Sequence, residues 1–234
     1  MMIILVIAHL PESNIRSVIP CIVYVTSSRF TPTLRRLWTQ NMKDSRCALR
    51  FFNNTDILWS VDDLGIAPEV HSVRPWAFKI DLWRYAQLGK FGGMFFDAEL
   101  ELNSPPERIF DLQLPRLQIP LDRDRRCLYN AMMASPPGDR ALDAILSRSL
   151  SNVRARSYGH SDSQTEPWLG ITGPCTAGRA ISSDEYKVIG RHIAPHTVDN
   201  SGMTISTSIA HVKNTFTDEK THYGHYWSAK TIYT

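Results

Sequence analysis

The sequence predicts an α/β fold, a mixed sheet flanked by helices, and three observations support this prediction. Short apolar runs that suit buried strands alternate with stretches of helical periodicity. The chain has 234 residues, 43% hydrophobic and 21% charged, which is typical of a globular protein with a sizeable core. Internal repeats and low-complexity tracts are absent from the sequence. We therefore expect residues 1–234 to form a single domain, with residues 1–18 as an N-terminal appendage.

The first part of the chain alternates strands with helices. Residues 21–26 are β-branched and aromatic and predict a buried strand, and residues 31–41 predict a helix with Thr31 as its N-cap. Residues 48–53 predict a second strand, and residues 56–64 a second helix. This alternation favours parallel strands joined by right-handed crossovers, as in Rossmann-like nucleotide-binding sheets.

The centre of the chain places two carboxylates at the end of a predicted strand. Residues 78–89 have helical periodicity, and the double glycine at 92–93 then breaks the chain. The apolar run 94–96 predicts a buried strand that delivers Asp97 and Glu99 at its carboxyl end, where ligands bind in open α/β sheets. Converging carboxylates suit a hard divalent cation, Mn²⁺ or Mg²⁺. A bare D-x-E also occurs as a solvated strand end, which is the simpler alternative.

The string that contains this acidic pair resembles a known family. It is similar to the central segment of DxD-motif glycosyltransferases of the family 32 type, which includes relatives of the yeast initiating α-1,6-mannosyltransferase and capsular polysaccharide enzymes. That segment has the form K-x-D-L-x-R-Y-x-x-L-x-x-x-G-G-x-[YF]-x-D-x-D. The departure is Glu99, where the family more usually has aspartate. The residues that match in register are Lys79, Asp81, Leu82, Arg84, Tyr85, Leu88, Gly92, Gly93, Phe95 and Asp97.

The resemblance implies a glycosyltransferase A fold and a metal-dependent, retaining transfer of sugar. The donor would be a nucleotide diphosphate sugar, a UDP- or GDP-sugar, and the acceptor a carbohydrate or glycoconjugate. Asp97, with Glu99, would hold Mn²⁺ or Mg²⁺ against the diphosphate. Asp81 would accept hydrogen bonds from donor-sugar hydroxyls, and Arg84 would orient the carboxylates or the phosphates. Without the resemblance, Asp81 and Arg84 would be a surface ion pair on a helix.

Weaker matches to the family extend the predicted site. Residues 19–24 loosely match its first strand, and the T-G-P element at 172–174 matches a segment that shapes its sugar-binding floor. The family ends its catalytic domain with a histidine shortly before a tryptophan; His222 and His225 both suit that pattern, and we assign His225 as a third metal ligand. The predicted substrate contacts are Tyr24, Val25, Thr26, Tyr85, Gly92, Gly93, Asn130, Gly173, Pro174, His225 and Trp227.

The second half of the chain has fewer local signals. Residues 101–120 are rich in proline and polar residues and predict irregular structure, whereas residues 130–134 predict a strand that returns to the sheet. Apolar residues at helical spacing predict a helix over residues 139–150. A polar surface loop over 151–167 and a helix within 171–181 complete the prediction.

Charge and cysteine content exclude several classes of protein. A net charge of +3 with scattered basic residues gives little support to nucleic-acid binding. The apolar residues 1–10 are too few to span a bilayer, so we expect no transmembrane segment. Neither a zinc site nor a disulfide framework is predicted, because the cysteines are widely spaced and form no C-x-x-C pair. A soluble protein of a reducing cytoplasm follows, which is the host cytoplasm if the source is a virus. The cysteines are Cys21, Cys47, Cys127 and Cys175.

Two other functions use the same features. A metal-dependent phosphoryl or nucleotidyl transferase also needs paired carboxylates and a cation, although the chain has no P-loop motif G-x-x-x-x-G-K-[ST]. A degenerate transferase domain that only binds carbohydrate is the other alternative, which the departure at Glu99 motivates.

Overall fold

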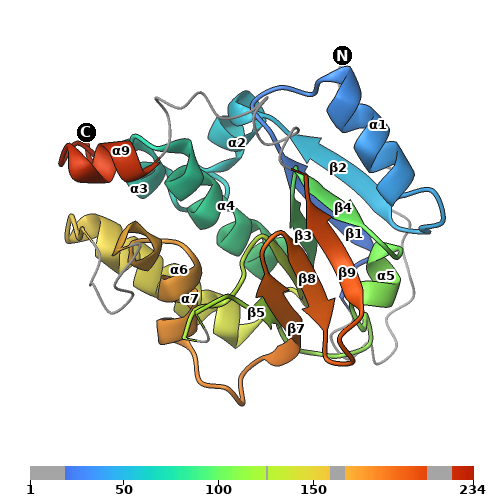
Figure 1. The fold of residues 1–234 in the computed structure, drawn as a ribbon. Helices are drawn as coiled ribbons and strands as arrows, with labels where there is room; N and C mark the ends of the chain where they lie inside the picture. The colour runs from blue at the N-terminus through green and yellow to red at the C-terminus, as the bar shows by residue number, and fades with distance from the viewer. Residues whose placement is uncertain (1–18, 125, 159–166, 210–222) are drawn as a thin grey trace, which may run out of the picture.

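The computed structural model describes residues 19–124, 126–158, 167–209 and 223–234, and a nine-stranded mixed sheet forms its centre (Figure 1). The predicted appendage lies outside the described residues. In sheet order the strands are β2 (Ala48–Phe52), β1 (Ile22–Thr26), β3 (Gly93–Asp97), β6 (Met132–Ser135), β5 (Gln118–Leu121), β7 (Lys187–Ile193), β8 (His196–Asp199), β9 (Thr204–Ser208) and β4 (Leu100–Leu102). The predicted class, a mixed sheet flanked by helices, is confirmed.

Helices cover both faces of this sheet, and each face has its own hydrophobic core. Side chains of β1 and β3 alternate between the cores: Tyr24 and Phe95 face α4 and α6, whereas Val23 and Phe96 face α1. The described helices are α1 (Pro32–Asn41), α2 (Asn54–Ser60), α3 (Ala67–Ser72), α4 (Trp76–Phe91), α5 (Pro106–Ile109), α6 (Arg140–Arg154), the 3₁₀ helix η1 (Pro167–Gly170), α7 (Pro174–Ala180) and α9 (Tyr223–Ser228).

The sheet curves so strongly that β4, its last strand in sheet order, begins close to the end of β3, its third strand. β3 ends at Asp97 and β4 begins at Leu100, yet these strands occupy the third and ninth positions of the sheet. Six steps across a flat sheet would separate them by roughly 29 Å, at about 4.8 Å a step. Three consecutive Cα–Cα steps reach at most about 11 Å. The sheet must therefore wrap round, and residues 98–99 connect the two strands where it closes.

The helices and strands predicted for the first part of the chain are present. The Thr31 side chain caps α1 by accepting a hydrogen bond from Leu34 N (3.2 Å). α2 starts two residues earlier than predicted, because Asn53 and Asp56 form a reciprocal capping box, and it ends four residues earlier, at Ser60, where residues 61–65 form turns. The strands β1 and β2 pair in parallel, as the alternation predicts.

The double glycine ends α4 later than predicted and starts β3. α4 continues through Gly89 to Phe91, since Gly92 has a positive φ of 64° and supplies the C-cap. Gly93 has φ 109°, and a Cβ there would lie 2.8 Å from a ring carbon of Tyr24. Both glycines are thus explained by backbone conformation and close packing.

Residues 101–120 contradict the prediction of irregular structure, because they contain most of β4, the helix α5 and most of β5. These strands are short, and their partners are distant in sequence: Leu100 pairs with Ser208, and Gln118 with Lys187. Helix α6 also continues to Arg154, into the predicted loop. Local periodicity does not report pairings of this kind.

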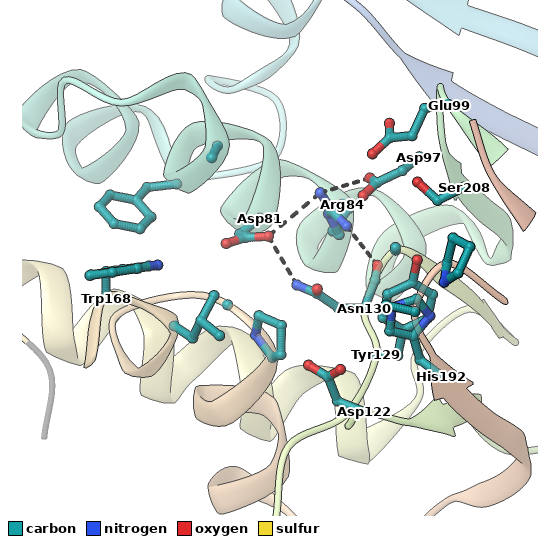
Figure 2. A pocket seen from close by; sticks show the side chains of 18 residues that line it. Asp81, Arg84, Asp97, Glu99, Asp122, Tyr129, Asn130, Trp168, His192 and Ser208 are labelled. Atoms are coloured by element: carbon teal, nitrogen blue, oxygen red, sulfur yellow. Dashed lines mark hydrogen bonds and ion pairs between the residues drawn. The ribbon is translucent and has the colours of Figure 1, made fainter. Parts of the chain in front are cut away.

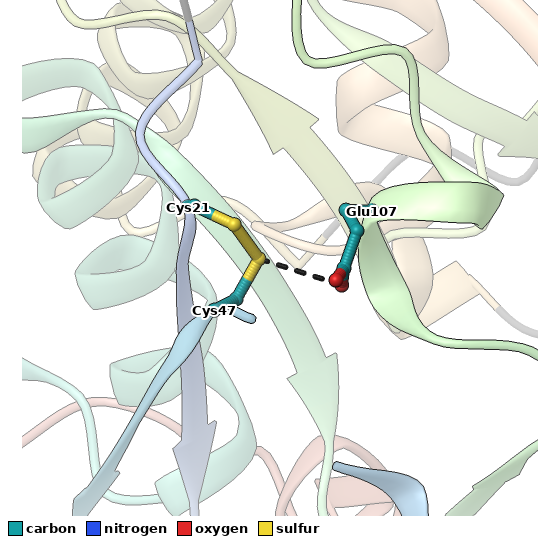
Figure 3. Close-up of side chains that lie close together, drawn as sticks. All are labelled: Cys21, Cys47 and Glu107. Carbon is teal, nitrogen blue, oxygen red and sulfur yellow. Dashed lines mark hydrogen bonds between the residues drawn. A yellow bond between two sulfur atoms is a disulfide. The ribbon is translucent and has the colours of Figure 1, made fainter. Parts of the chain in front are cut away.

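The structure contains two disulfides, so the prediction that the cysteines form no disulfide framework is wrong. Cys21 bonds to Cys47 and Cys127 to Cys175, across 26 and 48 residues of sequence. The first bond follows from the register of β1 and β2, which pairs Ile22 with Ala48 and so brings the preceding cysteines together (Figure 3). The inference of a reducing compartment relied on the absence of disulfides and loses its basis. Within the described ranges, no helix has the length and apolar character needed to cross a membrane.

Candidate active site

A cavity of about 500 Å³ lies beyond the carboxyl end of β3 (Figure 2). One side, which we call the α4 wall, presents Phe78, Asp81 and Arg84 of α4 together with Asn130. The opposite side, the β5–β7 wall, presents Asp122, which follows β5, Tyr129, which precedes β6, and His192 of β7. The acidic pair Asp97 and Glu99 closes the cavity where the sheet curls. Trp168 of η1 lies at the other end.

Helical spacing places the charged groups of the α4 wall in a row. Ala77, Asp81 and Arg84 are four and three residues apart, so their side chains project from the same side of α4 into the cavity. At 1.5 Å of rise per residue, this row extends for about 10 Å. The helical pattern in the sequence therefore also positions the polar side of the site.

Arg84 is the centre of a buried hydrogen-bonded network. Its guanidinium lies 3.2 Å from Asp97 Oδ1 and 3.5 Å from Asp81 Oδ1, and Nη1 donates to the Asn130 carbonyl (2.6 Å). The guanidinium carbon also lies 4.3 Å from the ring centre of Phe95. Burial opposes the charged form of Arg84, but the two carboxylates outweigh it and raise the pKa. Arg84 thus links the helix to the acidic pair.

Asp81 is held by neighbours on three sides. Asn130 Nδ2 donates to its Oδ1 and Thr172 Oγ1 to its Oδ2, both at 2.9 Å, in addition to the Arg84 contact. A carboxylate has about four acceptor positions, so one remains for a ligand. Burial raises the pKa of Asp81 to about 6, although Arg84 and the hydrogen bonds act in the opposite direction.

Three separate parts of the fold fix the backbone of the acidic pair. Asp97 N donates to the Ala131 carbonyl (2.7 Å), Trp38 Nε1 donates to the Ala98 carbonyl (3.0 Å), and Ile209 N donates to the Glu99 carbonyl (3.0 Å). The α1 helix, the residue before β6 and the residue after β9 therefore hold three consecutive residues in place. The two carboxylates are positioned by the scaffold and face the cavity.

The β5–β7 wall combines an aromatic stack with a carboxylate. The rings of Tyr129 and His192 are parallel within 2°, with centroids 3.9 Å apart. Leu121 pairs with Arg191 in the register of β5 and β7, so the next residues, Asp122 and His192, occupy neighbouring positions. Burial raises the pKa of Asp122. Burial also raises the pKa of Tyr129, and the charges of Asp97, Glu99 and Asp122 act in the same direction.

A disulfide ties the β5–β7 wall to α7 below the cavity. The Cys127–Cys175 disulfide connects the segment before Tyr129 to α7, and Leu128 N donates to the Pro174 carbonyl (3.0 Å). Gly178 allows this approach, because a Cβ there would lie 2.0 Å from the Arg126 carbonyl oxygen.

The charge of the cavity fits a divalent cation at the acidic pair. Among the described residues, the charged side chains of its lining are one guanidinium and four carboxylates, and Arg84 is already paired with two of them. A diphosphate would be repelled unless a cation offset this charge. Asp97 and Glu99 supply two carboxylate ligands from the described part of the chain. Two carboxylates are enough for Mg²⁺ or Mn²⁺, which keep positions for water and phosphates.

Comparison with known proteins gives little further information. No family model matches the chain, and no curated protein matches it. A solved structure named "PaToxG Glycosyltransferase" is similar at 13% sequence identity and a TM-score of 0.46, over 70% of this chain and 68% of that chain. A likeness of that size carries no argument, so the site itself must support any function.

The structure brings together most of the residues predicted around the acidic motif. The predicted residues that line the cavity are Asp81, Arg84, Asp97, Glu99, Asn130, Gly173 and Pro174. Tyr85 is buried behind this group, where its hydroxyl accepts a hydrogen bond from Asn130 Nδ2 (2.7 Å). Gly173 lies close to the network, because a Cβ there would lie 3.4 Å from Asp81 Oδ2.

Other predicted substrate contacts lie away from the cavity lining. Tyr24 and Val25 are core residues of β1, and Thr26 pairs with Asp97 in the register of β1 and β3. Gly92 and Gly93 lie at the amino end of β3, roughly 13 Å along the strand from Asp97 at about 3.3 Å per residue. Nothing in their positions supports contact with a substrate.

The C-terminal residues give a similarly mixed result. His225 is exposed on α9 and is not part of the cavity lining, so its predicted role as a metal ligand has no structural support. Trp227 packs against Trp168 with ring centroids 5.8 Å apart, and its Nε1 donates to the Tyr158 carbonyl (2.7 Å). Trp227 therefore supports a residue of the cavity instead of lining it. His222 lies outside the described residues.

Sequence reasoning missed the β5–β7 wall. Tyr129 had one local signal, its position directly before Asn130 at the start of a strand. Asp122 lies in a charged turn, and His192 lies in a strand that no pattern predicted. The missed residues of the lining that matter for the chemistry are Asp122, Tyr129, Trp168, His192 and Ser208.

Proposed function

We propose that this protein is a metal-dependent glycosyltransferase of the glycosyltransferase A type. It moves a sugar from a UDP- or GDP-sugar to a carbohydrate or glycoconjugate acceptor and retains the anomeric configuration. The observation that carries the proposal is the meeting, in one cavity, of Asp97 and Glu99 with the Asp81–Arg84 network. The motif resemblance assigns chemistry to the same residues.

Asp97 and Glu99 are the residues that would hold the cation. When bound, Mn²⁺ or Mg²⁺ neutralises the charge that grows on the leaving diphosphate. Arg84 acts on the acidic pair from the helix side, since its ion pair with Asp97 fixes one of the two carboxylates (3.2 Å). The carboxylate of Asp97 is 29% exposed, so it is within reach of a ligand in the cavity.

Asp81 is suited to bind a hydroxyl of the donor sugar. Asn130 and Thr172 fix its orientation, and its remaining acceptor position can receive one hydrogen bond. A carboxylate that is already ordered loses little freedom when the sugar binds. The Asn130 amide is oriented in turn by the Tyr85 hydroxyl.

Retention of configuration is consistent with the surroundings of Asp81. An inverting enzyme needs a base opposite the leaving group, whereas a retaining enzyme can pass the acceptor proton to the leaving phosphate. Asp81 already accepts hydrogen bonds from Asn130 and Thr172, an arrangement that suits a residue that orients a sugar hydroxyl. The resemblance is the basis for proposing retention.

The test is hydrolysis of sugar nucleotides, with water replacing the acceptor. The protein is incubated with a panel of UDP- and GDP-sugars plus Mn²⁺, and ¹H NMR identifies the products. Free sugar with nucleoside diphosphate indicates glycosyl transfer, and the anomeric proton reports the initial configuration. Sugar phosphate with nucleoside monophosphate would instead indicate attack at phosphorus, as a nucleotidyl transferase performs. Full activity in EDTA, or no turnover of any donor, would contradict the proposal.

A further inference from the structure

We propose that the β5–β7 wall is the acceptor subsite, and that Asp122 restricts it to neutral or amine-bearing sugars and rejects acidic ones. The proposal rests on the proposed function, because it assigns the second substrate of the same cavity. Its basis is the contrast between the two walls. The groups of the α4 wall bind one another, whereas the β5–β7 wall presents an aromatic stack and a carboxylate to the same space.

The stacked rings make a rigid surface of the kind that sugars bind. Tyr129 and His192 lie face to face at 3.9 Å, and His192 Nδ1 lies 3.4 Å from Thr197 Oγ1. Each ring is therefore held by a neighbour before a ligand arrives. Aromatic side chains offer apolar area together with a polar edge, which matches the mixed character of a pyranose ring. Pro195 adds apolar surface beside the stack.

Asp122 supplies the polar group of this wall. Its Oδ1 accepts a hydrogen bond from Arg123 N (2.6 Å), and within the described residues no ion pair neutralises its charge. Vicinal hydroxyls are good donors to such a carboxylate, and an ammonium group is better. The carboxylate is partly buried, so water screens its charge only in part.

The surrounding charge makes the selection against acids strong. Asp97, Glu99 and Asp122 all lie near enough to the Tyr129 hydroxyl to act on its ionisation. A divalent cation with a diphosphate does not remove this excess of negative charge. A carboxylate on the acceptor would meet Asp122 at short range, where repulsion between like charges that water screens only in part opposes binding. Discrimination then comes from rejection of the wrong acceptor as well as attraction of the right one.

A binding assay tests the subsite without requiring turnover. Saturation-transfer NMR titrations, with UDP or GDP and Mg²⁺ present, compare methyl glycosides with their 2-amino and uronide counterparts in the gluco, galacto and manno series. We expect a neutral or amino glycoside of at least one series to bind roughly tenfold or more tightly than its uronide. The Asp122→Asn variant should reduce that ratio about tenfold, with Asp122→Ser as the substitute if the first variant does not fold.

The matched control is Asp124→Asn, which alters a carboxylate of the same turn that pairs with Arg126 and does not line the cavity. Its selectivity should equal that of the wild type. The proposal is overturned if the uronide binds as well as the neutral glycoside, if Asp122→Asn leaves the ratio unchanged, or if no neutral or amino glycoside binds. The proposed function fails separately, in the hydrolysis assay, which contains no glycoside.

Discussion

The two walls of the cavity differ in how their charges are satisfied. On the α4 wall, Arg84 pairs with Asp81 and Asp97, and the Asn130 amide donates to both Asp81 and the Tyr85 hydroxyl of the same helix. On the β5–β7 wall, the described residues give Asp122 a backbone hydrogen bond and no ion pair. The first wall is organised before any ligand binds, and groups of that kind stabilise charge with little rearrangement. The β5–β7 wall instead presents the Asp122 carboxylate to a ligand in the cavity.

The structural supports of the two walls differ in the same way. Three of the four residues that define the α4 wall come from one helix of 16 residues. The β5–β7 wall gathers residues from a turn, from the segment before β6 and from strand β7, and the Cys127–Cys175 bond holds the segment that carries Tyr129 against α7. A site built on a helix depends on local sequence, whereas the second wall depends on long-range pairing. Substitutions at the two walls should therefore have different consequences, which range from a loss of catalysis to a modest change in acceptor affinity.

The largest effect is expected at the point where the α4 wall meets the acidic pair. Asp97→Ala should lower the rate of metal-dependent transfer by roughly 10³-fold, because a charge-stabilising group is lost at the leaving diphosphate. The melting temperature should fall by only a few degrees, since Arg84 keeps its contact with Asp81. Glu101→Ala is the matched control, because Glu101 is an exposed carboxylate of β4. Equal activity of the two variants would contradict the assignment of Asp97.

Replacing each disulfide in turn distinguishes an effect on stability from an effect on transfer. Loops of 26 and 48 residues predict similar stabilisation, about 3.5 and about 4 kcal/mol in the chain-entropy model. Replacing Cys21 and Cys47 by alanine, or Cys127 and Cys175, should therefore cost similar stability in urea unfolding. Only the second pair ties cavity-lining segments together, the one that carries Tyr129 and the α7 helix, so only its loss should lower transfer, by roughly tenfold. Equal effects of both pairs on transfer would mean that the connection below the cavity does not matter.

The buried charge of the α4 wall predicts a specific pH dependence of stability. Burial raises the pKa of Asp81 from 3.8 to about 6, so in the folded protein Asp81 holds a proton that the unfolded chain has lost. Its contribution to stability is full below about pH 4 and is lost as the pH rises through about 6. Asp81→Asn removes this dependence. Between pH 4 and pH 7 the variant should gain about 3 kcal/mol of unfolding free energy relative to the wild type.

Urea unfolding of both proteins in EDTA, at steps of pH, measures this difference. The matched control is Asp143→Asn, which replaces an aspartate of α6 that does not line the cavity. The same pH series on this control shows how much of the change is specific to Asp81. If the difference in unfolding free energy between Asp81→Asn and the wild type does not change with pH, burial does not raise the pKa of Asp81 in the folded protein.

The smallest effect tests the β5–β7 wall. Tyr129→Phe keeps the ring that stacks on His192 and removes the hydroxyl, so the wall should persist. If the hydroxyl contacts the acceptor, the acceptor KM should rise about fivefold, the equivalent of about 1 kcal/mol for one hydrogen bond. Tyr158→Phe is the control, as Tyr158 packs on Tyr233 outside the cavity lining. An unchanged KM for Tyr129→Phe would limit the wall to its aromatic surface and to Asp122.

Local sequence patterns were enough to predict the α4 wall. Helical spacing fixes the side of α4 on which Asp81 and Arg84 lie, and the apolar run of β3 places Asp97 at a strand end. Each of these signals lies within a few residues of what it predicts. The mixed sheet flanked by helices followed from the same alternation of short runs.

The β5–β7 wall depends on contacts that no short pattern encodes. Asp122 and His192 become neighbours because β5 pairs with β7, about seventy residues further along the chain. The cysteines show the same limit, since Cys21 and Cys47 meet through the pairing of β1 with β2. β4 has 3 residues, which is too short to show an alternating pattern. Its partner β9 is distant in sequence, since Leu100 pairs with Ser208.

Because the sheet curls, the number of residues between β3 and β4 is also constrained. Residues 98–99 connect the third strand of the sheet directly to its last, so they set how far β4 and β9 stand from β3. Inserting a residue there would allow the edge of the sheet to move relative to β3. It would also shift Glu99 relative to Asp97, even if every side chain were kept. The number of residues between these strands is therefore as much a property of the site as the carboxylates are.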